Sequence, residues 1–149
     1  KDITNYIMQN DGGTNHEIAK LLHIMYGHEF VCCTFKNNIW YKFNGNIWED
    51  DDQGVTLRSR ISNDIVNEYL KIQKYYTNKA IDTDETDKAK FIEKSSSIQK
   101  LIAKLRTRKF KDDVMKEAQE ILLREKRERE EHQRREKAEK AQKEREERV

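Results

Sequence analysis

The sequence predicts an α+β fold: a helix, a three-stranded antiparallel meander, two or three further helices, and a long charged helix at the C-terminal end. Three observations lead to this prediction. Alternating apolar residues flank Asn44-Gly45, a turn pair typical of hairpins, and they include both tryptophans. Apolar residues recur at helical spacing after Thr56. The chain also contains no proline, so nothing of that kind interrupts its helices.

The N-terminal part is expected to contain one helix. Residues 1–13 are interpreted as a polar lead-in that ends at Gly12-Gly13. Thr14 or Asn15 then caps a helix, and Glu17 follows Thr14 by three residues, as in a capping box. Apolar side chains recur at positions 18, 21, 22 and 25, and Gly27 is a suitable stop after them.

The meander is expected at about residues 29–35, 38–43 and 46–50, with a type I′ turn at Asn44-Gly45. In an alternating strand Trp40 shares a face with Lys42, so it either is exposed or meets Trp48 across the turn. Exposed aromatic rings can stack on the bases of single strands, but packing within the sheet is the preferred role. The acidic residues that follow, Asp50 to Asp52, are interpreted as a solvated turn.

Helices are predicted over the next part of the chain. The first spans about 56–78 and the second about 87–105, separated by an acidic loop from Ala80 to Thr86. Thr107 to Lys109 is the expected connector to a last helix that begins near Phe110. The buried stripes of these helices are expected to include Leu57, Ile61, Ile65, Tyr69, Ile72, Phe91, Ile98, Leu101, Ile102, Leu105, Val114, Met115, Ala118, Ile121 and Leu122.

The character of the chain changes at Arg124. Charged residues make up 39% of the whole chain, and they dominate its last part. Opposite charges recur four residues apart, as in Glu131 and Arg135, and each such pair supports a helix by about 0.2–0.5 kcal/mol. Without an apolar seam a coiled coil is disfavoured, so a single charged helix is predicted. The chain thus divides into 1–13, 14–123 and 124–149, the last being a fused, engineered or native extension.

Several kinds of catalytic site are disfavoured. Nucleotide hydrolysis through a phosphate-binding loop needs a G-x-x-x-x-G-K motif, and none is present. Metal-dependent nucleotide polymerisation needs clustered carboxylates, for which Asp50 to Asp52 is the one dense group. Zinc needs three or four ligands; His16 and His23 lie seven residues apart on one helix, and a site at His28 and one cysteine would need two further ligands. An enzyme with a dispersed site, using His28, Cys32 or Asp50, is the least favoured alternative.

A basic stretch is the strongest functional signal. The net charge of +2 is nearly balanced, but residues 94–111 contain basic side chains and no acidic one. Lysine and arginine bind nucleic acids by neutralising phosphates, so local density matters more than net charge. Lys100, Lys104 and Arg108 are spaced by four residues and are expected on one helical face. An ordinary solvated face is the alternative. The candidate nucleic-acid-binding residues are Lys100, Lys104, Arg106, Arg108, Lys109 and Lys111, with Arg58 and Arg60 as a second basic pair.

Several separated motifs carry a family resemblance. They are N-I-W-Y-K-F from Asn38, followed by Trp48, then T-L-R from Thr56 and I-S-N from Ile61. A later K-L-x-T-x-x-F-K pattern begins at Lys104 and continues to M-K-E at Met115. Over roughly residues 15–120 the chain resembles the linker or collar domain that precedes the superfamily 3 helicase module in primase–helicase proteins of nucleocytoplasmic large DNA viruses and related phages. The charged residues from Arg124 depart from the family pattern.

The resemblance implies a non-catalytic domain that links primase to helicase, supports ring assembly and contacts DNA. It implies DNA, other copies of the chain, and the primase and helicase modules as partners, with no membrane. ATP and magnesium would belong to the helicase module and not to this fragment. The expected location is intracellular, in the host cytoplasm or at a viral replication site. The alternative is a protein-interaction module whose long charged helix binds a partner and which has no nucleic-acid role.

Overall fold

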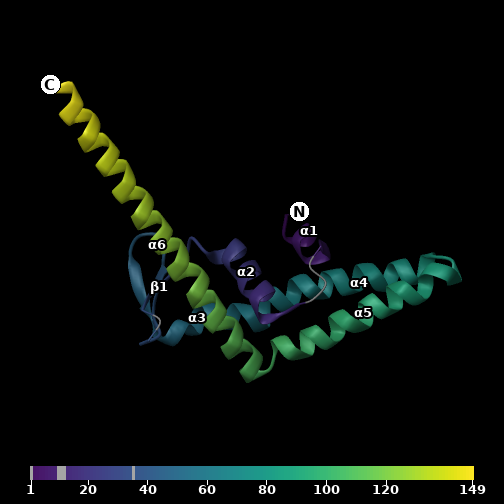
Figure 1. Ribbon diagram of the computed structural model, residues 1–149. Helices are drawn as coiled ribbons and strands as arrows, with labels where there is room; N and C mark the ends of the chain where they lie inside the picture. Colours follow the sequence, from purple (N-terminus) through teal and green to yellow (C-terminus); the bar gives the residue numbers. More distant parts are fainter. Residues whose placement is uncertain (1, 10–12, 35) are drawn as a thin grey trace.

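The computed structural model describes residues 2–9, 13–34 and 36–149, and it confirms the α+β class. In these residues two helices precede a three-stranded sheet, and most of the remaining chain is helical (Figure 1). A hairpin of two long helices extends away from the sheet, and the last helix crosses the body of the molecule and projects beyond it (Figure 1).

The segment interpreted as a polar lead-in contains a helix, α1 (Asp2–Gln9). Its apolar side chains hold it against the core: Ile7 is only 3% exposed. The hydroxyl of Tyr6 donates a hydrogen bond to the backbone oxygen of Glu17 at 3.1 Å. Ile3 and Ile7 lie four residues apart, one helical turn, and this spacing is the sequence signal for α1.

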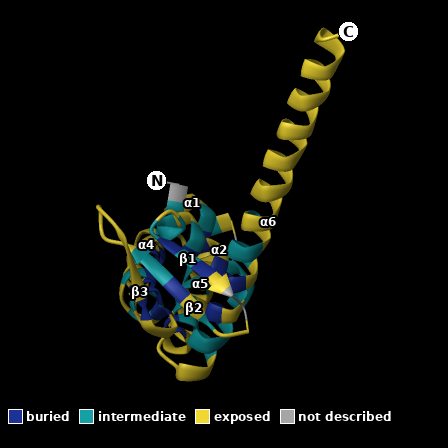
Figure 2. Cartoon of the chain, turned by 90° about the vertical axis from the view of Figure 1, so that its left-hand side faces the viewer, coloured by how far each residue is buried: buried dark blue, intermediate teal, exposed yellow. Residues whose placement is uncertain are grey.

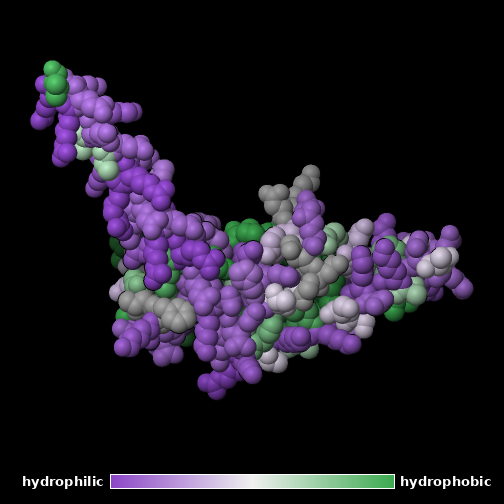
Figure 3. Space-filling view, in the orientation of Figure 1, coloured by the Kyte–Doolittle hydropathy of each residue, from purple (hydrophilic) through white to green (hydrophobic). Residues whose placement is uncertain are grey.

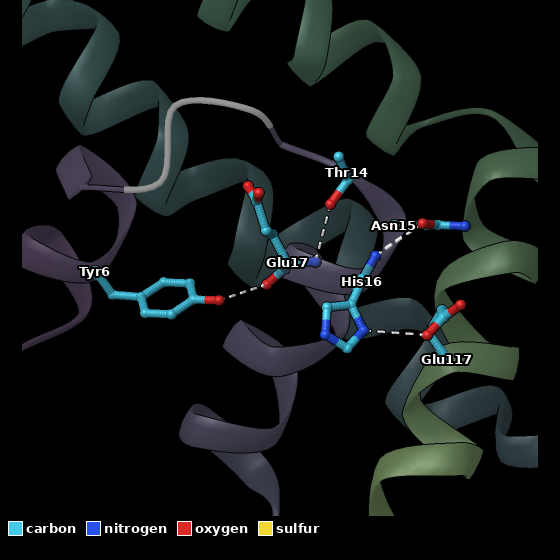
Figure 4. Close-up of polar contacts among 6 residues, drawn as sticks. All are labelled: Tyr6, Thr14, Asn15, His16, Glu17 and Glu117. Carbon is cyan, nitrogen blue, oxygen red and sulfur yellow. Dashed lines mark hydrogen bonds and ion pairs between the residues drawn. The ribbon is translucent and has the colours of Figure 1, made fainter.

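The second helix is α2 (Asn15–Tyr26), and its cap is Thr14, one of the two predicted residues. The hydroxyl oxygen of Thr14 accepts a hydrogen bond from the backbone nitrogen of Glu17 at 3.3 Å (Figure 4). The Glu17 carboxylate accepts from the backbone nitrogen of Gly13 at 2.9 Å, one residue earlier than in a standard capping box. Gly27 does follow the helix, but its φ of −57° is right-handed. The structure therefore does not show the left-handed stop typical of glycine there.

The meander is confirmed in the described residues. Strands β1 (Phe30–Thr34), β2 (Ile39–Phe43) and β3 (Trp48–Asp51) are antiparallel and lie in sequence order. The pairing of β1 with β2 is irregular between Cys32 and Thr34. Side chains alternate between faces, so Cys32 is buried.

The predicted two-residue turn at Asn44-Gly45 is wrong. Phe43 pairs with Trp48, so the loop has four residues, 44–47. Gly45 has a φ of +103°, but Asn44 does not have the positive φ that a type I′ turn requires. Instead the side-chain oxygen of Asn44 accepts hydrogen bonds from the backbone nitrogens of Asn46 and Ile47, each at 2.9 Å. This local hydrogen bonding by asparagine stabilises the longer loop.

The two tryptophans have different environments. Trp40 is fully buried, which confirms the preferred packing role for this residue. It pairs across the sheet with Asp51, so the proposed contact with Trp48 across the turn is wrong. Trp48 is 47% exposed and packs against Phe43, with ring centroids 5.3 Å apart.

A long, nearly continuous helical segment follows the sheet. After the 3-10 turn η1 (Asp52–Gly54), α3 (Val55–Arg60) continues through the π-helical segment η2 (Ile61–Ile65) into α4 (Val66–Asp82). The loop predicted from Ala80 to Thr86 is therefore too long, because α4 extends to Asp82. The predicted stripe is confirmed, since every member is buried: Leu57, Ile61, Ile65, Tyr69 and Ile72.

The remaining helices are α5 (Glu85–Leu105) and α6 (Arg108–Glu147). The predicted connector of residues 107–109 is displaced, because α6 already begins at Arg108. The helices α4 and α5 pack along each other, and α6 packs on α2 and β1. Ile102, Leu105, Val114, Met115 and Ala118 are buried as predicted, and Phe91, Ile98, Leu101, Ile121 and Leu122 are half-buried against the core.

The charged end of the chain is a direct continuation of α6. Beyond Glu125 its residues are exposed as α6 leaves the body of the molecule (Figure 2). The projecting part is uniformly hydrophilic except near its tip (Figure 3). Glu131 and Arg135 form the expected pair at 3.7 Å. Among the described residues, no helix combines the length and apolar character needed to cross a bilayer.

Candidate nucleic-acid interface

Four exposed basic residues gather where α5 ends and α6 begins. We call Lys104, Arg106, Arg108 and Lys109 the basic corner. Only Arg106 and Thr107 separate the two helices, and the hydroxyl of Thr107 donates to the backbone oxygen of Lys104 at 2.7 Å. The four exposed residues thus lie within six positions of the chain, around this short turn.

The N-terminus of α6 adds positive potential to the basic corner. Thr107 occupies the capping position, and its backbone oxygen accepts from the backbone nitrogen of Lys111 at 3.2 Å. The first turn of α6 contains no acidic residue. Helix N-termini carry partial positive charge and usually favour acidic neighbours, so a basic first turn leaves this charge uncompensated. An anion placed at the corner would meet both the side chains and the helix end.

The structure separates some residues that the sequence groups together. A common helical face for Lys100, Lys104 and Arg108 is wrong, because Arg108 begins a new helix after the turn. Lys100 and Lys104 line a cleft beside α1. Lys111 is half-buried in the first turn of α6, next to the basic corner.

Arg58 lies against the first turn of α6. Its guanidinium pairs with the carboxylate of Asp112 and also donates to the backbone oxygen of Arg108 at 3.3 Å. The side chain of Arg58 therefore connects α3 to the first turns of α6. One of its contacts is with the backbone of Arg108, which belongs to the basic corner. The nucleic-acid role predicted for Arg58 stays a prediction.

Arg60 also has intramolecular partners. It pairs with Asp64 at 3.3 Å, and its guanidinium lies 4.7 Å from the ring centroid of Tyr26. The Tyr26 hydroxyl donates a hydrogen bond to Asp64. Burial, together with this hydrogen bond to Asp64, raises the pKa of Tyr26 from 10.0 to about 12. Arg60, Asp64 and Tyr26 thus form one polar cluster between α2 and the helical segment after the sheet.

We expect Tyr26→Phe to weaken the loss of stability at alkaline pH. The folded-state pKa of Tyr26 lies above its ordinary value, so the stability from the neutral hydroxyl is complete below pH 10.0. This contribution is lost as the pH rises from 10.0 towards 12. Urea unfolding across that range should show a shallower decline for Tyr26→Phe than for the wild type. Tyr75 is 45% exposed, and the control variant Tyr75→Phe should show the same decline in stability as the wild type. Equal slopes for all three proteins would contradict the expectation.

One of the acidic residues at the end of the third strand, Asp51, has a structural role. Asp50 and Asp51 belong to β3, so the interpretation as a solvated turn is wrong for them. Asp51 is only 4% exposed, and its carboxylate accepts from the backbone nitrogen of Thr56 at 3.1 and 3.2 Å. Asp51 therefore caps the start of α3. Within the described residues, no group of three or more histidine, cysteine or acidic side chains could hold a metal ion.

Two histidines contact α6 instead of gathering around a common centre. His16 Nδ1 lies 3.2 Å from Glu117 (Figure 4), and His23 Nε2 lies 2.8 Å from Glu125. These contacts hold α2 along α6. They explain the seven-residue spacing of the histidines, because two turns of α2 face two turns of α6.

A cleft of about 570 Å³ lies between α1, α4 and α5 and was not predicted from the sequence. It brings Ile7 and Met8 of α1 next to Lys90 and Lys94 of α5. Lys94 belongs to the basic stretch but was not among the predicted site residues. From the sequence, residues 1–13 are interpreted as a polar lead-in, and no helix is predicted there. The wall of the cleft that α1 forms is therefore missing from the prediction.

Comparison with known proteins identifies a family and two relatives from large DNA viruses. Residues 19–144 match the family model described as "D5 N terminal like". A candidate helicase of Acanthamoeba polyphaga mimivirus is 34% identical over 119 residues, which cover 80% of this chain and 12% of that protein. A candidate helicase of Frog virus 3 (isolate Goorha) is 51% identical over 53 residues, which cover 36% of this chain and 5% of that protein. The chain thus corresponds to a small part of these relatives.

Proposed function

This chain belongs to the D5 N terminal like family, and from that membership we propose that it is the non-catalytic domain joining primase to helicase in a viral DNA replication protein. In this role it helps copies of the protein assemble into a ring and contacts DNA. Two relatives are named as helicases and are much longer than the matched region, which supports a domain within a larger replication protein.

The basic corner is the observation that supports DNA contact. Its side chains are exposed, and the uncompensated N-terminus of α6 lies among them. Phosphate oxygens are the anions that such an arrangement accepts without reading the base sequence. Lys100 and Lys111 extend the corner along α5 and α6, whereas Arg58 positions its backbone. DNA contact through the corner would therefore depend on charge and salt more than on sequence.

The remaining chemistry of the replication protein belongs to other modules. ATP and magnesium would bind the helicase module, and nucleotide polymerisation would belong to the primase module. In the proposed arrangement, this domain contacts both modules of the same polypeptide and neighbouring copies in the ring. The protein would act inside the infected cell, in the host cytoplasm or at a viral replication site.

Charge reversal at the basic corner tests this proposal. We expect Arg106→Glu/Arg108→Glu/Lys109→Glu to abolish DNA binding, measured by fluorescence anisotropy with labelled single- and double-stranded DNA. Acidic residues in the first turn of a helix are stabilising, so the Arg108→Glu and Lys109→Glu changes favour α6 and unfolding does not explain the loss. For about four phosphate contacts, wild-type affinity should fall on the order of a hundred-fold between about 50 and 200 mM salt.

The matched control carries the same charge change on the projecting part of α6. Arg134→Glu/Lys137→Glu/Arg145→Glu should retain DNA binding, because these exposed residues lie far along the helix from the corner. If the control lost binding as completely as the corner variant, DNA binding would depend on the positive charge of the whole chain and not on the basic corner. Absence of wild-type binding at low salt would contradict the DNA role altogether.

A protein-interaction module is the second candidate function. The exposed, hydrophilic continuation of α6 favours it, since this helix surface has no packing partner among the described residues (Figures 2 and 3). Partner binding through that surface would not require DNA and would survive substitution of the basic corner. Deletion of residues 126–149 would abolish it, whereas the DNA-binding proposal expects the deleted protein still to bind DNA.

A further inference from the structure

The cleft between α1, α4 and α5 has the size of a binding site. Its volume of about 570 Å³ lies within the range of about 300–1,000 Å³ common for ligand pockets. α1 forms one wall through Ile7 and Met8, and α5 forms the other. Tyr69, Ile72 and Tyr76 of α4 form the floor. The cleft and the basic corner share one residue, Lys104, and are otherwise separate features.

The interior of the cleft is apolar. Ile72 on the floor is 3% exposed, and the half-buried Ile98 and Leu101 of α5 project beside it. Burial raises the pKa of Tyr69, so its hydroxyl stays neutral across the physiological range. Apolar side chains of a partner could therefore enter the cleft without burying a charge against them. An apolar floor of this kind favours a hydrophobic anchor.

The rim of the cleft on α5 is basic. Lys90, Lys94, Lys100 and Lys104 line it, and Glu93 is the acidic residue beside them. None of the four lysines forms an ion pair with a described residue, although Lys94 lies 5.3 Å from the ring centroid of Tyr76. From Lys90 to Lys104 the rim follows about 21 Å of helix. This is the length of an amphipathic helix of about four turns.

We propose that this cleft binds an acidic amphipathic helix of a partner protein. Leucine-like side chains on one face of that helix, at i, i+3, i+4 and i+7 spacing, would pack against the half-buried apolar residues that line the cleft, Met8, Ile98 and Leu101. Glutamate or aspartate on the flanking face would meet the lysines of α5. Charge complementarity selects the acidic partner, and the apolar floor selects an amphipathic one.

The same observations disfavour single-stranded nucleic acid as the occupant. Base stacking needs aromatic faces that a base can cover. Tyr69 and Tyr76 are only 4% and 7% exposed, so their rings are already covered by the protein. The lysines alone would attract phosphates, but an apolar floor contributes nothing to phosphate binding.

The proposal is tested with a fluorescein-labelled helical peptide of about 16 residues, which has leucines on one face and glutamates beside them. The full 149-residue chain should bind it, and Lys90→Glu/Lys94→Glu should weaken binding at least ten-fold. The matched variant Lys74→Glu/Lys88→Glu carries the same charge change at exposed residues outside the cleft and should bind like the wild type. Methyl NMR signals of Ile7, Ile72 and Ile98 should shift when the peptide is added.

Three outcomes would overturn the proposal. A scrambled peptide of identical composition that binds equally well would show attraction between opposite charges only. Single-stranded DNA that shifts the same methyl signals and displaces the peptide would assign the cleft to nucleic acid. Absence of binding at about 1 mM peptide would show that the cleft does not bind such a helix. Because Lys90 and Lys94 lie outside the basic corner, each result is independent of the DNA-binding test.

Discussion

Replacing Trp40 with alanine is expected to lower the free energy of unfolding by about 3–5 kcal/mol, the usual cost of truncating a large buried aromatic side chain. Trp40 is fully buried in the sheet. Its indole nitrogen donates to the side-chain oxygen of Asn38 at 2.8 Å, and that oxygen also accepts from the amide of Gln119. Trp40→Ala would therefore leave a cavity and would also break a hydrogen-bond network that joins the sheet to α6.

Denaturant unfolding followed by circular dichroism measures this effect, and Trp48→Ala is the matched control. Trp48 is 47% exposed and packs mainly on Phe43, so its loss should cost about 1 kcal/mol. The two variants remove the same side chain from neighbouring strands, and only the environment differs. Equal destabilisation of the two proteins would contradict the burial of Trp40.

Gly54→Ala is expected to destabilise the protein by about 2–5 kcal/mol, because two costs add at this position. Gly54 has a φ of +71°, which disfavours any residue with a Cβ. The added Cβ would also lie 3.0 Å from the Trp40 ring and 2.7 Å from the terminal methyl of Met115. The methyl of Met115 can move, but Trp40 is enclosed by the core. The change should lower the midpoint of urea unfolding.

Gly45→Ala separates the backbone cost from the packing cost. Gly45 also has a positive φ, but nothing lies within 4 Å of the position that its Cβ would take. Its substitution should therefore cost only the backbone part, about 1–2 kcal/mol. If Gly54→Ala were no more destabilising than Gly45→Ala, the close approach of Gly54 to Trp40 would be contradicted.

Much of the fold was predictable because helical and strand periodicities are local properties. The stripe from Leu57 to Ile72 identifies a buried face without reference to the rest of the chain. The alternation in β2 does not, because Ile39 and Phe43 are exposed whereas Trp40, on the other face, is buried. The differences arise where side-chain hydrogen bonds compete with backbone preferences. Asn44 forms such bonds within its own loop, so the turn lengthens to four residues.

The candidate site was predicted only in part. The density of basic residues from Lys100 to Lys111 is visible in the sequence, and the structure gathers four of them at one corner. Their grouping depends on the turn at Arg106 and Thr107, whereas the sequence predicted the connector at residues 107–109. The pairing of Arg58 with Asp112 joins residues 54 positions apart, and no local pattern indicates such a contact.

The sequence by itself determined the α+β class, the buried stripes, the charged continuation of the last helix and the family resemblance. Each of these depends on residue types at short spacings. The tertiary structure alone decided that α1 closes a cleft beside α5, that Asp51 caps α3, and that the N-terminus of α6 lies within the basic corner. These features depend on contacts between distant segments, whose geometry follows from how all the apolar faces share one core.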